Sequence, residues 1–444
     1  MKTLYRWLVG IPLLVVLSFV FWPSGGHLEP LPPARRSIVF SDYLGMNTPL
    51  LFYEPQVYRR QLDMLKALGL QWVRVDLHWD HMEPTAGNWR YDLLDPLMQT
   101  LQEGGFKPVV YLVGTAPFAA TVPEGTPFRD QYPPRDNNEF ASRITTLAQR
   151  YPFVTHWQVW NEPNILPFWR PKEDPDAYGR MLQAAARSMR EKQLANRKIV
   201  SAGMAYYSQM PLRGNALMLD ALRDSGALQS ADVVAYHPYS DEPEGDPSLS
   251  DPDNFIKRAQ IINSKLRSAN VQQIWATEWG WSTYTGPKDF QTQISEQQQA
   301  EYLLRRLMLM MPLDFDRVFW FSFSEIDKIV SERDRHYGLV RPDASAKPAW
   351  HALKRFLTIT GDRLEPIAPL QAIGTQPAIY HHSWQRADGK RLTLFYGKQA
   401  GSFQLSASQP VQLHWPATGG SQILSPQSGA ITVPIQTSLG VLVY

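Results

Sequence analysis

The sequence predicts an α/β protein whose main body is a (β/α)8 TIM barrel, followed by a small C-terminal β-sandwich and preceded by an N-terminal membrane leader. Three observations lead to this prediction. Eight apolar, strand-like runs alternate with helical segments between residues 37 and 360. From residue 364 to 444 only short strand-like runs occur. No charged residue lies between Trp7 and Trp22.

Length and composition support this organisation. A chain of 444 residues suits one large barrel with an appended domain, and its 44% hydrophobic residues can bury a large core. The formal net charge of +2 gives no general attraction to nucleic acid, so we expect no nucleic-acid partner. Because the chain has no cysteine, a thiol nucleophile, a disulfide and a cysteine-bound metal are excluded.

The N-terminus predicts export. Lys2 and Arg6 precede the apolar run 7–22, which is short against the roughly 20 residues of a membrane span. We interpret residues 1–22 as a signal-anchor or a signal peptide, and favour an anchor in the inner membrane with the rest of the chain on the periplasmic side. If the leader is cleaved, the protein is periplasmic or secreted. The Pro-rich residues 23–36 are predicted to be a linker.

The barrel, predicted over 37–360, rests on the strand-like runs. They are short and continuously apolar, as expected for parallel strands buried on both faces: 37–47, 71–79, 107–114, 156–164, 198–204, 231–239, 272–280 and 317–324. A doubly wound open sheet is the alternative. It is less favoured because no Gly-rich phosphate loop occurs in the first strand–helix turn.

Helical signals separate these runs. Residues 55–69 carry an apolar face and end at Gly69, and a second helix starts at Asp136 with Glu139 as the partner in a capping box. The second helix has an apolar face formed by Phe140, Ile144, Leu147 and Ala148. Asp174 and Pro175 open a third helix, and two more are expected over 296–311 and 346–357.

The C-terminal region lacks a helical period. A hairpin is predicted to turn at residues 387–389, and short strands follow at 402–407, 411–416, 421–426, 430–435 and 440–444. This pattern predicts a β-sandwich over residues 364–444.

Two of the barrel strands end in a glutamate. "HWQVWNEPN" delivers Glu162 at the end of the fourth strand, and "IWATEWG" delivers Glu278 at the end of the seventh. The active site of a (β/α)8 enzyme lies at the C-terminal ends of the strands, so both side chains should face one pocket. A facing pair of carboxylates is the equipment that glycoside hydrolysis needs.

These motifs resemble those of a known family. "WQVWNEPN" and "IWATEWG" are similar to the acid/base and nucleophile strands of clan A glycoside hydrolases, in particular family 39. "LGMN", "VRVDLHW", "YHPY" and "FWFSF" resemble other strands of the clan. The layout of leader, barrel and small β-domain is similar to that of hydrolases from exopolysaccharide operons.

The resemblance implies a retaining double displacement. Glu162 would be the acid/base and Glu278 the nucleophile, with carboxyls about 5–5.5 Å apart. Glu162 should then have a raised pKa, for which the negative charge of Glu278 and the aromatic surroundings would be the causes. Asn161 would bind the sugar 2-hydroxyl, and the further substrate-binding residues would be Arg74, His237, Tyr239, Trp320, Trp79 and Trp281. Of these, Arg74 and Tyr239 would also donate hydrogen bonds to Glu278.

Structural roles remain open for several of these residues. Arg74 can instead form an ion pair with Asp76 or Asp80, His237 and Tyr239 can be core residues, and the tryptophans can pack the barrel rim. No metal and no cofactor are expected, because His78 and His81 have no third, distant ligand in the sequence. Ser-His-Asp hydrolysis is not supported, since no G-x-S-x-G elbow occurs.

We therefore expect an exported, endo-acting β-glycoside hydrolase whose substrate is a polysaccharide, in particular a bacterial exopolysaccharide. Endo action rests on Trp89 and Trp169 as further groove residues. A non-catalytic polysaccharide-binding assembly factor and a transglycosylase are the alternatives. The expected partners are the substrate, the inner membrane and the exopolysaccharide biosynthesis machinery.

Overall fold

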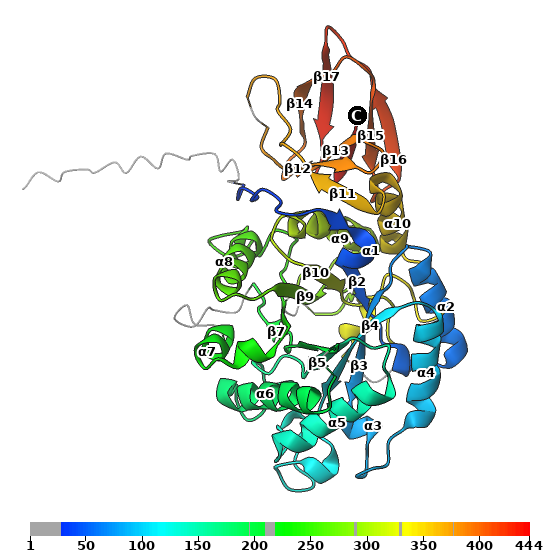
Figure 1. The fold of residues 1–444 in the computed structure, drawn as a ribbon. Helices are drawn as coiled ribbons and strands as arrows, with labels where there is room; N and C mark the ends of the chain where they lie inside the picture. Colours follow the sequence, from blue (N-terminus) through cyan, green and yellow to red (C-terminus); the bar gives the residue numbers. More distant parts are fainter. Residues whose placement is uncertain (1–27, 195, 209–217, 288–290, 328–330, 376) are drawn as a thin grey trace, which may run out of the picture.

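The computed structural model describes residues 28–194, 196–208, 218–287, 291–327, 331–375 and 377–444 (Figure 1). The predicted leader, residues 1–22, lies outside these residues. Among the helices of the described part, none combines the length and the apolar character that crossing a membrane requires.

Within the described residues, eight parallel strands close into a barrel in the order β2-β3-β4-β5-β6-β8-β9-β10, with β10 pairing back onto β2. This confirms the predicted fold. The strands are β2 (Leu44–Asn47), β3 (Trp72–His78), β4 (Lys107–Val113), β5 (His156–Val159), β6 (Lys198–Val200), β8 (Val233–His237), β9 (Gln273–Trp279) and β10 (Arg317–Trp320). The short β7 (Met204–Ala205) extends the fifth strand position and pairs with β8.

The barrel interior is filled by side chains at its amino-terminal end. Trp72, Trp275 and Phe319 belong to a buried apolar cluster contributed by several strands. Gly45 faces the Phe319 ring, which a Cβ atom at that position would overlap. This packed layer fills the barrel interior, and the active site of such barrels lies at the carboxyl ends of the strands.

The helices surround the barrel, as Figure 1 shows. They are α2 (Pro55–Lys66), α3 (Trp79–Met82), α4 (Tyr91–Glu103), α5 (Asn137–Arg150), α6 (Pro175–Glu191), α7 (Met218–Asp224), α8 (Asn254–Ser268), α9 (Glu296–Met310) and α10 (Pro348–Thr360), with short 3-10 turns between some of them. The predicted N-caps of α5 and α6 are confirmed, because Asp136 and Asp174 accept hydrogen bonds from first-turn backbone N–H groups. At the start of α5 the Asp136 side chain accepts from the backbone N–H of Asn138. A capping box with both reciprocal hydrogen bonds is formed by Ser295 and Gln298 at the start of α9.

One predicted strand is wrong. Residues 37–47 divide into β1 (Ile38–Val39), the one-turn helix α1 (Phe40–Tyr43) and β2. The break occurs because β1 pairs antiparallel with β11 of the C-terminal sheet, whereas β2 belongs to the barrel. One short segment therefore serves two sheets.

The C-terminal region is all β, as predicted. In the described chain, one antiparallel sheet has the order β1-β11-β12-β13-β18-β15-β16, and β14 pairs with β17 in a second. Apolar side chains from both sheets, including Phe395, Leu413 and Val433, form its core. The strands are β11 (Arg363–Pro366), β12 (Ile379–Arg386), β13 (Arg391–Gly397), β14 (Gly401–Ser406), β15 (Val411–Trp415), β16 (Gly420–Leu424), β17 (Ala430–Ile435) and β18 (Gly440–Val443).

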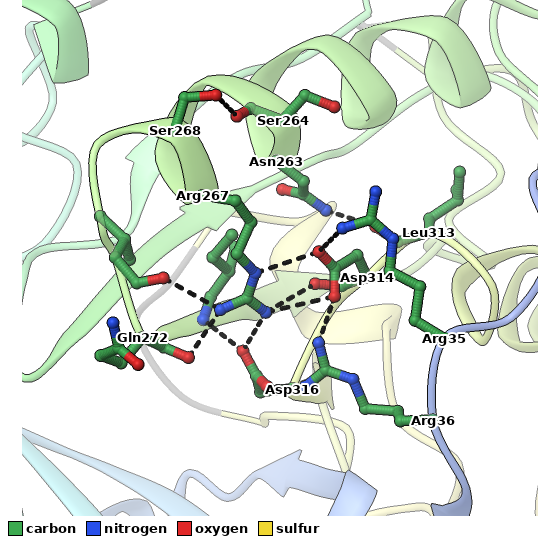
Figure 2. A network of polar contacts seen from close by, with 12 residues as sticks. Arg35, Arg36, Asn263, Ser264, Arg267, Ser268, Gln272, Leu313, Asp314 and Asp316 are labelled. Carbon is green, nitrogen blue, oxygen red and sulfur yellow. Dashed lines mark hydrogen bonds and ion pairs between the residues drawn. The ribbon is translucent and has the colours of Figure 1, made fainter.

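The described part of the predicted linker is fastened to the barrel. Figure 2 shows Arg35, Arg36 and Arg267 of α8 converging on Asp314 and Asp316, which lie before β10. Arg267 Nε is 3.0 Å from Asp314 Oδ2, and its Nη2 is 2.7 Å from Asp316 Oδ2. This segment is therefore held against the folded body by several charged contacts at once.

The C-terminal sheets contact the loop that follows β8. Tyr396 donates a hydrogen bond to Glu244, which also pairs with Arg305 of α9 at 2.6 Å. Lys398 Nζ is 2.5 Å from Asp253 Oδ1. Glu244 and Asp253 are both buried, so this interface holds a loop that begins close to the carboxyl end of β8.

Candidate active site

The fourth barrel strand ends abruptly before Glu162. β5 stops at Val159, and both Trp160 and Glu162 have positive φ angles, of 72° and 38°. The Glu162 backbone N–H donates to Gly203 O at 3.1 Å, which fixes this turn. Left-handed backbone in a non-glycine residue costs free energy and is concentrated at functional sites. The turn brings Asn161 and Glu162 to the mouth of the barrel.

Glu162 and Glu278 share a cavity of about 480 Å³. One carboxylate oxygen of each residue and a ring nitrogen of His237 lie within 4.8 Å of one another. In retaining glycosidases the carboxyl groups are about 5–5.5 Å apart, whereas inverting enzymes need about 6.5–9.5 Å to admit a water molecule. An approach of two carboxylate oxygens to within 4.8 Å favours the retaining geometry.

Two donors hold the Glu278 carboxylate. Arg74 Nη1 donates to Oε1 at 2.6 Å, and Tyr239 Oη donates to Oε2 at 3.1 Å. Each oxygen of the Glu278 carboxylate thus accepts a hydrogen bond, which fixes the orientation of the side chain. These are the two donors that the sequence predicts for Glu278.

Arg74 positions several side chains of the site. Its guanidinium donates to Asn47 and Asn161, both at 2.8 Å, and to Gln158 at 2.7 Å. It also stacks on Tyr111 and is only 1% exposed. Arg74 also lines the cavity, so direct contact with the substrate stays a prediction. The interaction with Asn161 orients an amide that the sequence predicts for the sugar.

Glu162 has a different environment. Tyr207 Oη donates to Oε1 at 2.9 Å, and His237 Nδ1 lies 2.7 Å from the same oxygen. Burial raises the pKa of Glu162 to about 8, and the nearby charge of Asp334 acts in the same direction. The expected direction is correct, but burial is the main cause rather than the charge of Glu278. Oε1 carries these contacts, so we assign Oε2 to hold the proton.

His237 is completely buried and touches both carboxylates. Its Nδ1 is 3.6 Å from Glu278 Oε2, in addition to the Glu162 contact, and its Nε2 is 3.0 Å from Thr277 Oγ1. Burial lowers the pKa of His237 to about 3, so the ring is neutral. Because Nδ1 faces carboxylate oxygens, we assign its proton there, with Nε2 accepting from Thr277. His237 thus supports Glu162 and does not reach the cavity as the predicted substrate ligand.

The predicted sugar platforms are not on the cavity surface. Trp79, Trp320 and Trp281 are at most 1% exposed, and none is among the described residues that line the cavity. Trp79 packs against Phe118 and Phe140, while Trp320 packs against Trp279 and Trp281. A ring without accessible surface cannot stack on a sugar, so these assignments are corrected. Trp89 and Trp169 are likewise outside the lining.

Other residues take their place. The cavity lining that the sequence analysis did not assign to the substrate includes Asn47, Asp76, His78, Tyr111, Tyr207, Phe321 and Tyr337. Asp76 and His78 follow Arg74 at alternate positions of β3, a period-2 signal that was available in the sequence. Phe321 follows Trp320 directly and is the aromatic residue of that strand end that reaches the cavity.

Two groups of described residues have the spacing of metal ligands: Glu162, His237 and Glu278, and separately His78, Asp80 and His81. In the first group, Glu278 already pairs with Arg74. In the second, His81 is largely exposed and pairs with Asp80 at 3.2 Å.

Comparisons with known proteins agree with the barrel fold. A family model described as β-galactosidase matches residues 52–163, about a quarter of the chain. A family 39 glycoside hydrolase from Bacteroides cellulosilyticus WH2 superimposes with a TM-score of 0.70 at 18% identity, covering 91% of this chain and 82% of that chain. The chain is similar to clan A glycoside hydrolases. This confirms the resemblance indicated by the strand motifs.

Two further structures extend the similarity. A monomeric β-xylosidase from Caulobacter crescentus CB15 has a TM-score of 0.62 at 17% identity, covering 93% of this chain and 97% of that chain. A GH30 endoxylanase from Clostridium papyrosolvens C71 has a TM-score of 0.61 at 12% identity, with the same two coverages. No curated protein matches the sequence. At such identities the solved structures establish the fold alone.

Proposed function

We propose that this protein is a retaining β-glycoside hydrolase in which Glu278 is the nucleophile and Glu162 is the acid/base. The observation that carries the proposal is the contrast between two carboxylates within 4.8 Å of each other. Arg74 and Tyr239 donate to one, and burial raises the pKa of the other to about 8. A double displacement needs one carboxylate as nucleophile and one carboxyl that holds a proton, and Glu162 holds its proton at neutral pH.

In the first step, a Glu278 oxygen forms a bond to the anomeric carbon as the bond to the leaving oxygen breaks. Glu162 gives its proton to that oxygen, so the leaving group departs as a neutral alcohol. The products are a glycosyl ester on Glu278 and an ionised Glu162. Asn161, oriented by Arg74, is placed to bond the sugar 2-hydroxyl, a contact that strengthens in the transition state.

In the second step, Glu162 takes a proton from water, whose oxygen displaces the Glu278 carboxylate from the anomeric carbon. Arg74 lowers the pKa of Glu162. Esterification removes the Glu278 charge that balances Arg74, so the guanidinium then stabilises an ionised Glu162 more strongly. Both carboxyls return to their starting protonation states.

The substrate that we propose is a polysaccharide, in particular a bacterial exopolysaccharide, cleaved within the chain. The location that we propose is the periplasmic side of the inner membrane, near exopolysaccharide biosynthesis machinery, with residues 7–22 as anchor. Its support is the charge-free N-terminal run and the order of leader, barrel and β-domain. The buried Trp169 gives endo action no support, so product analysis must decide it.

The test uses the chain from residue 28 with β-glucans, mannans, xylans and the host exopolysaccharide. Chain length and new reducing ends are followed for wild type, Glu162→Gln and Glu278→Gln. Chain shortening by wild type that both variants lose supports the proposal. Wild-type binding without cleavage would leave the polysaccharide-binding assembly factor instead. Longer products in the presence of an added acceptor sugar would indicate a transglycosylase.

A further inference from the structure

Asp76 is a carboxylate of the cavity that the proposed mechanism does not use. It lines the cavity together with Glu162 and Glu278, and its side chain is 17% exposed. It accepts no hydrogen bond from any residue that the structure describes. The side chain closest to it among its ion-pair contacts in the described residues is His78, whose Nε2 is 3.9 Å from Asp76 Oδ2, beyond hydrogen-bond distance. A carboxylate in a substrate cavity accepts hydrogen bonds from donors, and a ligand can supply these donors.

The position of Asp76 points to a particular part of the substrate. Arg74 and Asp76 lie on the same face of β3, about 7 Å apart along the strand, and Arg74 bonds Glu278. The nucleophile carries the glycone, the sugar whose anomeric carbon is attacked. Asp76 therefore lies two residues along β3 from Arg74, which bonds the nucleophile that carries this sugar.

The loop that follows β5 forms a wall of another character. Ile165, Pro167 and Phe168, in the loop directly after Glu162, line the cavity with apolar surface. The acid/base faces the leaving group, so this apolar wall belongs to the leaving-group side. The polar wall of β3 belongs to the glycone side, where hydroxyl groups must be fixed before attack.

We propose that Asp76 binds two adjacent hydroxyls of the glycone and thereby determines which sugar the proposed hydrolase accepts. A carboxylate with both oxygens available accepts from a vicinal diol in a bidentate manner. The substrate class is a neutral sugar with two free neighbouring hydroxyls. A uronic acid would bring a second negative charge to this wall, and an acylated diol would lack the donors. This inference rests on the proposed function for its substrate.

The experiment uses 2,4-dinitrophenyl β-glycosides of xylose, glucose, galactose and mannose, together with the monodeoxy analogues of the best substrate. Wild type is compared with Asp76→Asn and Asp76→Ala. Asp80→Asn is the matched control, since it makes the same change in charge close to the same strand end and is not part of the described lining. We expect kcat/KM to fall about ten- to a hundredfold in Asp76→Asn, as for a lost hydrogen bond to a charged group.

The deoxy analogues separate recognition from structural damage. The analogue that lacks a recognised hydroxyl should be poor for wild type and no poorer for Asp76→Asn. Equal fractional losses on every analogue, or no loss on the parent glycoside, would overturn the inference.

A binding arm keeps this inference separate from the proposed function. If wild type hydrolyses neither these glycosides nor the polysaccharides of the first test, the proposed function fails. Calorimetry with the corresponding S-linked thioglycosides then decides about Asp76. Weaker binding by Asp76→Asn than by wild type and Asp80→Asn would uphold its role. Equal or absent binding would overturn it.

Discussion

Replacing Glu162 by glutamine should make the protein more stable at alkaline pH while it removes the proposed acid. The carboxyl is buried, and both of its donors point to Oε1. The amide oxygen of glutamine can accept the same hydrogen bonds from Tyr207 and His237. The substitution therefore imitates the protonated carboxyl and removes only its ability to ionise.

The magnitude follows from the pKa. Burial raises the pKa of Glu162 from an ordinary 4.5 to about 8. Below pH 4.5 the carboxyl is protonated in the folded and unfolded states, so wild type and variant should be equally stable. Between pH 4.5 and 8 the unfolded state releases the proton first, and wild type loses about 1.4 kcal/mol per pH unit through this group. At pH 9 the variant should be the more stable by about 5 kcal/mol.

The assay is guanidinium unfolding followed by tryptophan fluorescence at pH 5, 7 and 9. Glu124→Gln, at an exposed position, is the control for the same change in charge. The quantity of interest is the difference in unfolding free energy between wild type and Glu162→Gln at each pH. Parallel pH dependences for these two proteins would refute the reasoning, because the carboxyl would then titrate alike in the folded and unfolded states.

Four further predictions follow from the site and its supports. The kcat/KM for substrates with poor leaving groups should fall tenfold per pH unit above pH 8, as Glu162 loses its proton. The same alkaline decrease in kcat/KM should be absent for a substrate with a dinitrophenyl leaving group. Glu278→Gln should lower the unfolding free energy by about 3–5 kcal/mol, because Arg74 keeps a buried charge without its carboxylate; equal denaturation midpoints would contradict this. Gly203→Ala should reduce kcat at least tenfold, since its Cβ would overlap the His237 ring, with Gly401→Ala as a tolerated control. Lys398→Met should cost about 1–3 kcal/mol in thermal or denaturant unfolding, because buried Asp253 loses a partner; an unchanged midpoint would show that the interface does not hold the loop after β8.

The strands and most helices were predictable because their signals are local. Continuous apolar runs mark buried parallel strands, and Asp136 and Asp174 mark helix starts whatever the tertiary structure. The break after Val39 was not predictable, since it depends on pairing with β11, more than three hundred residues later in the chain. Pairing between distant segments leaves no periodic signal in either of them.

The errors at the site concern the direction of side chains. Arg74, Asp76 and His78 face the cavity, so Trp79, at the next position, points away from it. The same alternation places Phe319 in the barrel interior and Phe321 in the cavity lining, and turns Trp320 outward. Counting from one inward residue would have corrected these assignments. No count could have placed Glu162, because the positive φ angles after β5 break the alternation.

The two carboxylates are chemically alike, but their surroundings differ. Glu278 receives a hydrogen bond from a cation, whereas Glu162 receives one from a phenol and contacts a neutral imidazole. The two carboxylates therefore have opposite effects on the stability of the fold. An ionised Glu278 stabilises the fold by pairing with buried Arg74, while a Glu162 that keeps its proton until about pH 8 makes the fold less stable in alkali. Arg74 connects the two carboxylates. When the charge of Glu278 is removed, the positive charge of Arg74 is no longer balanced and stabilises an ionised Glu162 more strongly. In the proposed mechanism, formation of the glycosyl ester on Glu278 therefore lowers the pKa of Glu162 through the buried guanidinium of Arg74. This change lets the proposed acid act as a base in the second step.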